Sequence, residues 1–306
     1  MPNLNRRQLI AAGSAAFTLP TISRLAQAQE RRFEPRPGNW RTFEITTRVE
    51  IPVPNGASRV WLPVPSVNDS YQKSGDNSFN TNGKAEMQAD PTYGARFLYV
   101  EFPASQDKPF AELTSRFQTQ DRAVDWSARA PGREATEYLR RWTQPTELMP
   151  TDGIVRTTAL DATKGAATDL EKTRKLYDWI VANTYREPKV RGCGVGDIKT
   201  MLETGNLGGK CGDINGLFVG LCRAAGIPAR DVYGIRLVPS AFGYKELSGN
   251  PANLKSAQHC RAEVHLAEHG WVAMDPADVG KVMRLETPEW VKTTAHPVVA
   301  PVNKAL

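Results

Sequence analysis

The chain is 306 residues long, with 40% hydrophobic and 24% charged residues, a composition that excludes a disordered chain and suffices for one large domain or two ordinary ones. Its formal net charge is +6, but the first 28 residues hold three arginines and no acid, so the remainder has 36 basic against 33 acidic residues. So small an excess gives no support for a nucleic-acid-binding surface.

The first 28 residues have the three parts of a signal peptide. Arg6 and Arg7 give a basic start, residues 9–22 form an apolar run, and Ala28 ends a small-x-small cleavage motif. The arginine pair resembles the twin-arginine export signal. An ordinary secretory signal or an N-terminal membrane anchor is the alternative, although the run is short for a bilayer span. We therefore expect a periplasmic or secreted mature protein without a membrane span.

Residues 33–132 predict an antiparallel β-domain, most simply a β-sandwich. Short runs that alternate apolar and polar residues are separated by Pro, Gly, Asn and Asp, a pattern typical of half-buried strands joined by turns. Residues 65–94 are polar and rich in turn-forming residues. We expect a long excursion there, with room for one irregular strand.

Residues 133–290 form a second domain, in which a helical pattern precedes further strands. A glycine-rich loop is expected at 186–210, and residues 291–306 are expected to form an extended, loosely held C-terminal tail. The expected helices lie near 134–144, 154–166, 169–185 and from Asp197 onward, and the expected strands near 229–237, 260–267 and 271–275. This order of elements predicts an α+β fold.

A cysteine begins the most apolar helix of the chain. From Cys211 to about residue 225, apolar residues recur at helical spacing, and Gly226 ends the pattern. The first turn of a helix has unpaired backbone N–H groups and the positive end of the dipole. Because both favour an anion, we expect Cys211 to be a reactive thiolate, whereas Cys222 lies on the apolar stripe and is expected to be a core residue.

A nucleophilic thiol needs a base and a group that orients the base. His259 opens a predicted strand, and Asp275 ends the strand that follows it in a hairpin, so both lie at the same end of a sheet. A tight turn near residue 269 leaves them offset by about four residues, roughly 13 Å; direct contact therefore requires a wider loop or a bulge. His265 and His269 lie near the turn and are expected to be solvated.

The three segments that carry Cys211, His259 and Asp275 together resemble the transglutaminase-like superfamily of papain-type thiol enzymes. The resemblance covers residues 165–280 in the order Cys, His, Asp. It implies a core of helices packed on an antiparallel sheet, with Cys211 as nucleophile, His259 as general base and acid, and Asp275 as the group that holds the imidazole. It also implies an oxyanion hole that includes the Cys211 backbone N–H. Arg261, where many relatives have Trp, and the second thiol of Cys260 depart from the pattern and leave the lining of the pocket open.

The implied reaction is attack on a peptide or side-chain amide through an acyl-enzyme. We expect hydrolysis, as in a peptidase or amidase; acyl transfer from protein glutamine to an amine, and a non-enzymatic binding scaffold with this fold, are the alternatives. Exported enzymes meet peptides or proteins of the cell envelope, so these are the expected substrates. The β-domain is expected to pack on the core rather than to dock the substrate.

No cofactor or metal is expected. A zinc site could recruit Cys193, Cys211, Cys260 and His259, but their spacing matches no zinc motif. The loop around Cys193 is instead expected to form a wall of the cleft near Cys211. A reversible disulfide between Cys193 and Cys211 is a further hypothesis, which free alkylation of both thiols in protein from its native compartment would exclude.

Overall fold

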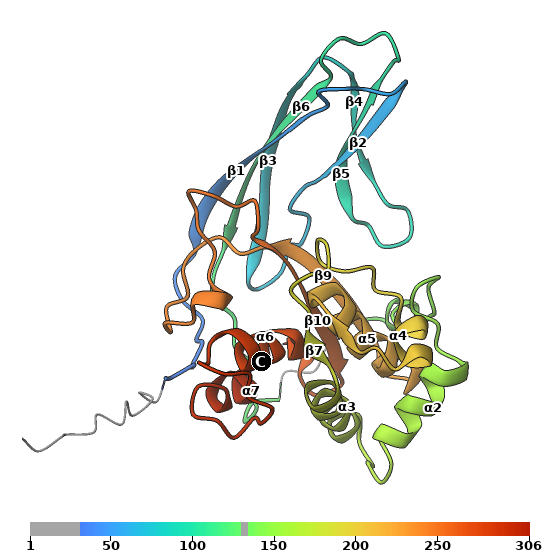
Figure 1. Ribbon diagram of the computed structural model, residues 1–306, viewed down its shortest axis with the longest axis vertical. Coiled ribbons are helices and arrows are strands. Elements are labelled where there is room, and N and C mark those ends of the chain that lie inside the picture. The colour runs from blue at the N-terminus through green and yellow to red at the C-terminus, as the bar shows by residue number, and fades with distance from the viewer. Residues whose placement is uncertain (1–30, 130–133) are drawn as a thin grey trace, which may run out of the picture.

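The computed structural model describes residues 31–129 and 134–306, and Figure 1 shows two antiparallel β-sheets at one end of the molecule and a helix-and-sheet domain at the other. The α+β prediction is thereby confirmed. The predicted signal peptide, residues 1–28, lies outside the described residues. Within the described ranges, no helix is both long and apolar enough to cross a membrane.

The N-terminal domain consists of two three-stranded antiparallel sheets. Their strand orders are β1-β6-β3 and β2-β5-β4. The strands are β1 Arg41–Glu50, β2 Ser58–Pro63, β3 Gln72–Thr81, β4 Lys84–Ala89, β5 Arg96–Phe102 and β6 Phe110–Thr119. Leu62, Leu98 and Leu113 come from both sheets and meet in one buried cluster, as expected for a sandwich-like arrangement.

The segment 65–94 contains two regular strands, so the prediction of one irregular strand there was wrong. Both β3 and β4 lie at the edges of their sheets, and β3 is largely exposed. A strand with water on most of its surface needs no apolar alternation, and the sequence signal is therefore weak. A β-bulge between Ser74 and Asn77 and the close approach of Gly75 to the Arg116 carbonyl add to the irregular pattern.

The second domain packs helices against the antiparallel sheet β11-β10-β9. Its elements are α1 Thr136–Arg141, α2 Gly153–Ala162, α3 Asp169–Asn183, β7 Tyr185–Arg186, α4 Ile198–Thr204, β8 Gly208–Gly209, α5 Cys211–Ala224, β9 Ala229–Ile235, the short 3₁₀ helix η1 Lys245–Leu247, β10 Gln258–Leu266, β11 Gly270–Met274, α6 Pro276–Leu285 and α7 Ala300–Ala305. The helices and strands predicted for this domain are confirmed to within a few residues.

Helix α5 is the centre of this domain, and all of its residues are buried. It packs on β9 and β10 and is flanked by α2, α3, α4 and α6. Its glycines allow the close contacts. A Cβ on Gly220 would lie 2.1 Å from the Ile198 side chain, and one on Gly212 would lie 2.8 Å from the Cys193 carbonyl oxygen. The loop that carries Cys193 is thus fixed directly against the start of α5.

The predicted extended tail at 291–306 was wrong, because this segment ends in α7. Val298, Val299 and Val302 are buried in the domain core, and the last residue accepts a hydrogen bond from the Asp275 backbone N–H at 3.0 Å. Pro301 suits the first turn of a helix. A helix of six residues is too short to show a periodic pattern, so only its packing reveals it.

The two domains meet at Glu263 on β10. The Glu263 side chain is fully buried, and Arg122, Arg230 and Arg261 surround it. Burial alone raises the pKa of Glu263, but these guanidinium groups outweigh that effect and hold it below its usual range. The Tyr71 hydroxyl of the β-domain donates a hydrogen bond to the same carboxylate at 3.3 Å. The β-domain thus packs on the core, as expected.

Candidate active site

Cys211 lies in the first turn of α5, where the sequence predicts it. Its neighbours are held by Asp213, whose carboxylate accepts hydrogen bonds from the backbone N–H groups of Lys210 and Gly196, each at 2.9 Å. Gly194 lies over this carboxylate with φ at +98°, and a Cβ there would lie 1.9 Å from it. The glycine-rich loop therefore closes over the start of α5.

Three free thiols meet at this helix start. The sulfur atoms of Cys193, Cys211 and Cys260 all lie within 4.8 Å of one another. The pKa of Cys211 is lowered to about 3, chiefly by a hydrogen bond from the Cys260 side chain and, against the opposing effect of burial, by His259. Cys211 and burial in turn raise the pKa of Cys260. The cluster thus holds one thiolate and two thiols.

His259 and Asp275 are in direct contact. The distance between His259 Nε2 and Asp275 Oδ2 is 2.6 Å, which leaves Nδ1 on the other side of the ring. Desolvation lowers the pKa of His259, but Asp275 and Asp278 outweigh it and raise that pKa to about 9. An imidazolium is therefore the stable form of His259 at neutral pH.

The register of the hairpin decides the offset between His259 and Asp275, which the sequence left open. The turn consists of three residues, Ala267–His269, because Leu266 pairs with Gly270 and Ala262 with Met274. That register leaves an offset of two residues. The chain also leaves the sheet at Asp275, which is the N-cap of α6, and its side chain accepts a hydrogen bond from the Asp278 backbone N–H at 3.1 Å. The bend at this cap completes the contact.

Asn215 is a site residue that the sequence analysis missed. It lies on α5 four residues after Cys211 and is fully buried. Its Nδ2 donates to Asp275 Oδ1 at 3.0 Å and to the Cys260 carbonyl at 2.8 Å, and its Oδ1 accepts from the Ala277 N–H at 3.2 Å. One side chain thereby fixes α6 and β10 to α5. A polar residue one turn after the cysteine on an apolar helix was the available signal.

Asp278 and Arg236 form the outer part of the site and were also missed. The Asp278 carboxylate lies 2.5 Å from Arg236 Nη2 and 3.7 Å from His259 Nε2. His259, Asp275 and Asp278 have donor atoms close enough to hold a metal ion, as have the three cysteines. The His259 imidazole and the Arg236 guanidinium already face the carboxylates of Asp275 and Asp278. The negative charges of the two carboxylates are therefore balanced by side chains.

The remaining histidines are less exposed than predicted. His265 is buried, with its Nε2 atom 3.3 Å from Glu134 Oε2 and its ring 5.4 Å from that of Trp271. His269 is half-buried beside Trp126. Both predictions of solvated side chains were wrong, because Glu134 and Trp271 lie against His265 and Trp126 lies against His269.

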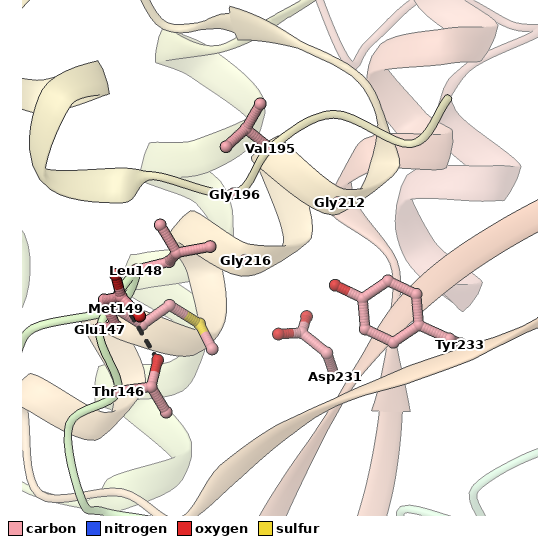
Figure 2. Close-up of a pocket in the computed structure, with 10 residues that line it drawn as sticks. All are labelled: Thr146, Glu147, Leu148, Met149, Val195, Gly196, Gly212, Gly216, Asp231 and Tyr233. Atoms are coloured by element: carbon pink, nitrogen blue, oxygen red, sulfur yellow. Dashed lines mark hydrogen bonds between the residues drawn. The ribbon is translucent and has the colours of Figure 1, made fainter. Parts of the chain in front are cut away.

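A cavity of about 250 Å³ opens next to the helix start that carries Cys211. Figure 2 shows Gly212 and Gly216 of α5 on one side and the Asp231 and Tyr233 side chains of β9 facing them. Cys211, His259 and Asp275 do not line this cavity, which reaches the site through Gly212, the residue after Cys211. A thiolate with a charged imidazole and a carboxylate is an arrangement suited to nucleophilic attack on a carbonyl compound.

Comparisons with known proteins agree with this architecture. Residues 156–276 match the core of the transglutaminase-like superfamily. An uncharacterized protein of Haemophilus influenzae is 36% identical over 263 residues, which are 79% of this chain and 70% of that protein.

Two solved structures are 16% identical to this chain in sequence, and the first of them resembles its fold. A candidate cysteine protease from Cytophaga hutchinsonii has a TM-score of 0.59, with 80% of this chain and 79% of that chain covered. The periplasmic domain of TgpA from Pseudomonas aeruginosa has a TM-score of 0.38, with 87% and 77% covered. With the family match and the relative above, the chain belongs to the transglutaminase-like superfamily.

Proposed function

We propose that the protein is an exported thiol enzyme that cleaves peptide or side-chain amide bonds through an acyl-enzyme. Cys211 is the nucleophile, His259 the general acid and base, and Asp275 the group that holds the imidazole. The observation that carries this proposal is geometric: Cys211 begins the buried helix α5, and His259 Nε2 lies 2.6 Å from Asp275 Oδ2. The pKa shifts agree with it, since the pKa of Cys211 is lowered to about 3 and that of His259 is raised to about 9. Such shifts are typical of a thiolate–imidazolium pair.

The first half of the reaction forms a thioester. The Cys211 thiolate attacks the amide carbon, and negative charge develops on the carbonyl oxygen. The Cys211 backbone N–H, in a helix turn without intrahelical acceptors, donates a hydrogen bond to that oxygen. The His259 imidazolium gives its proton to the amide nitrogen, the C–N bond breaks, and an amine leaves. His259 is then neutral, while Asp275 at 2.6 Å keeps the ring in place.

The second half regenerates the thiolate. Neutral His259 takes a proton from a water molecule, and the resulting hydroxide attacks the thioester carbon. The C–S bond breaks, a carboxylic acid leaves, and the thiolate and imidazolium return. Hydrolysis is favoured because water is the default acceptor; an amine in place of water gives acyl transfer as the alternative activity.

The proposed location is the periplasm or the exterior of the cell. It is supported by the composition of the first 28 residues, and it makes peptides or proteins of the cell envelope the proposed substrates. A binding scaffold without activity is the competing proposal. The buried contacts among Asn215, Asp275 and His259 speak against it, since a scaffold does not need a charged imidazole beside a thiolate.

The test is the pH dependence of alkylation of the mature protein by iodoacetamide, with each labelled cysteine identified by peptide mass. We expect Cys211 to react fastest, with an apparent pKa far below the reference of about 8.5, and we expect that pKa to rise in His259→Ala. Cys222, buried on the same helix, is the internal control. An unreactive Cys211 under reducing conditions would overturn the proposal.

A further inference from the structure

The cavity beside Cys211 has an acidic lining. Its walls are formed by Thr146, Glu147, Leu148, Met149, Val195, Gly196, Gly212, Gly216, Asp231 and Tyr233. These ten residues include two carboxylates and no basic side chain. The cavity reaches Gly212, the residue after Cys211, and Tyr233, which pairs with Cys260 between β9 and β10. It is therefore the space next to the thiols that a substrate side chain could enter.

Asp231 is the buried acidic group in the wall of this cavity. It lies on β9, and its Oδ1 atom is shut off from solvent without a hydrogen-bond partner among the described residues. Burial raises the pKa of Asp231 to about 7, and Arg223 offsets only part of this effect. The Arg223 guanidinium is engaged elsewhere, since it donates to the carbonyl oxygens of Ala229 and Gln144 at 2.8 and 3.1 Å. A buried carboxyl without a donor is costly unless a ligand supplies one.

The other walls suit an aliphatic chain. Gly212 and Gly216 present bare backbone, and the Met149 side chain and the Tyr233 ring border the space between them and Asp231 (Figure 2). Glu147 is exposed and adds a second negative charge to the lining. Methylene groups pack on such surfaces while a charged end reaches a carboxylate.

We propose that this cavity binds a substrate side chain that is an alkyl chain ending in a primary ammonium group, with Asp231 as its ion-pair partner. The proposal rests on the proposed function of Cys211 as the nucleophile and names the specificity of the same site. An apolar side chain leaves Asp231 without a donor, and an anionic one is repelled by both carboxylates. An ammonium group supplies the missing donor and the opposite charge.

The test uses two alkylating reagents with the same reactive group and different tails. N-(4-aminobutyl)iodoacetamide has an ammonium-terminated tail, and N-pentyliodoacetamide has an uncharged tail of equal length. We measure the second-order rate of Cys211 modification by each reagent. Because the same thiol reacts with the same reactive group, the ratio of the two rates reports tail recognition. We expect the ammonium reagent to react about ten to a hundred times faster.

Variants and pH identify the recognising group. Asp231→Asn keeps the shape of the side chain, and we expect the rate ratio to fall close to one. Glu147→Gln, on the exposed side of the lining, should lower it only a few fold. Glu203→Gln, an exposed acid on α4, is the matched control and should change nothing. In the unmodified protein the ratio should rise between pH 6 and pH 8, as Asp231 loses its proton.

The outcomes separate the two proposals. Equal rates for both tails in the unmodified protein overturn the cavity proposal and leave the proposed function intact. Failure of Cys211 to react with either reagent overturns both. If Asp231→Asn does not fold, as judged by circular dichroism, the decision rests on the pH dependence of the rate ratio and on Glu147→Gln. A rate ratio that changes neither with pH nor in Glu147→Gln overturns the proposal.

Discussion

One cysteine lies near each end of α5, and the two buried thiols differ in their pKa and in the groups around them. Cys211 at the N-terminal end has its pKa lowered to about 3 by Cys260 and His259. At the other end, burial alone raises the pKa of Cys222 far above its usual range. The same side chain in the same helix is thus an anion at one end and a neutral core residue at the other.

Both thiols are buried, so the groups around each thiol decide which of them is reactive. At the N-terminal end β10 supplies His259 and Cys260, and the turn into α6 supplies Asp275. At the C-terminal end Cys222 contacts the apolar core. Only the first environment offers hydrogen bonds and positive charge to a thiolate.

Removal of each thiol in turn gives the largest contrast. Cys211→Ala should lower the rate of amide cleavage by at least about 10⁴-fold, because the nucleophile is lost. Its melting temperature should change little. Cys222→Ala should leave the rate unchanged and cost about 1 kcal/mol of stability through the small cavity it creates. Initial rates and thermal melts of the two variants measure this, and equal effects on activity would remove the contrast.

The pH profile tests the charge pair at the N-terminal end. As pH rises through about 3, Cys211 loses its proton, and as pH rises through about 9, His259 loses its own. The thiolate–imidazolium pair therefore exists between these values, and kcat/KM should be flat from about pH 5 to pH 8 and fall above about 9. In His259→Ala, the pKa of Cys211 from the alkylation profile should shift upward, because a favourable charge is gone. A profile that rises steadily through pH 8 would contradict the pair.

Asn215→Ala tests how α5 holds the other two residues. We expect a loss of about 10- to 100-fold in kcat, as for groups that orient catalytic side chains. The alkaline limb should also move to lower pH, because Asp275 loses the donor at 3.0 Å that fixes it beside His259. Rates measured from pH 6 to pH 10 give both quantities. A lower melting temperature with an unchanged pH profile would assign Asn215 a structural role only.

Cys260 should have the smallest effect on activity. Cys260→Ala removes the largest single contribution to the lowered pKa of Cys211, so that pKa should rise by about one or two pH units. The thiol still ionises below neutral pH, and the rate at pH 7 should stay within about threefold. Cys260→Ser keeps a hydrogen-bond donor and should restore most of the shift. Alkylation profiles of the two variants measure it; identical profiles in both would show that the donor is irrelevant.

Features that depend on residues close together in the chain could be predicted from the sequence. Periodicity and the glycines around Cys211 predicted α5 and its start, and alternation predicted the strand that carries His259, because short-range spacing fixes which face of an element is buried. The order Cys211, His259 and Asp275 then suggested the family and the fold class, both of which agree with the structure.

Features that depend on contacts between distant segments became visible only in the folded protein. The two edge strands β3 and β4 and the short helix α7 lack a local pattern, since pairing and packing stabilise them. The contact of His259 with Asp275 needed the three-residue turn and the bend at α6. Asn215 and the cluster of three thiols join segments that lie far apart in the chain. Spacing along a sequence cannot encode such contacts, because they arise when separate elements pack together.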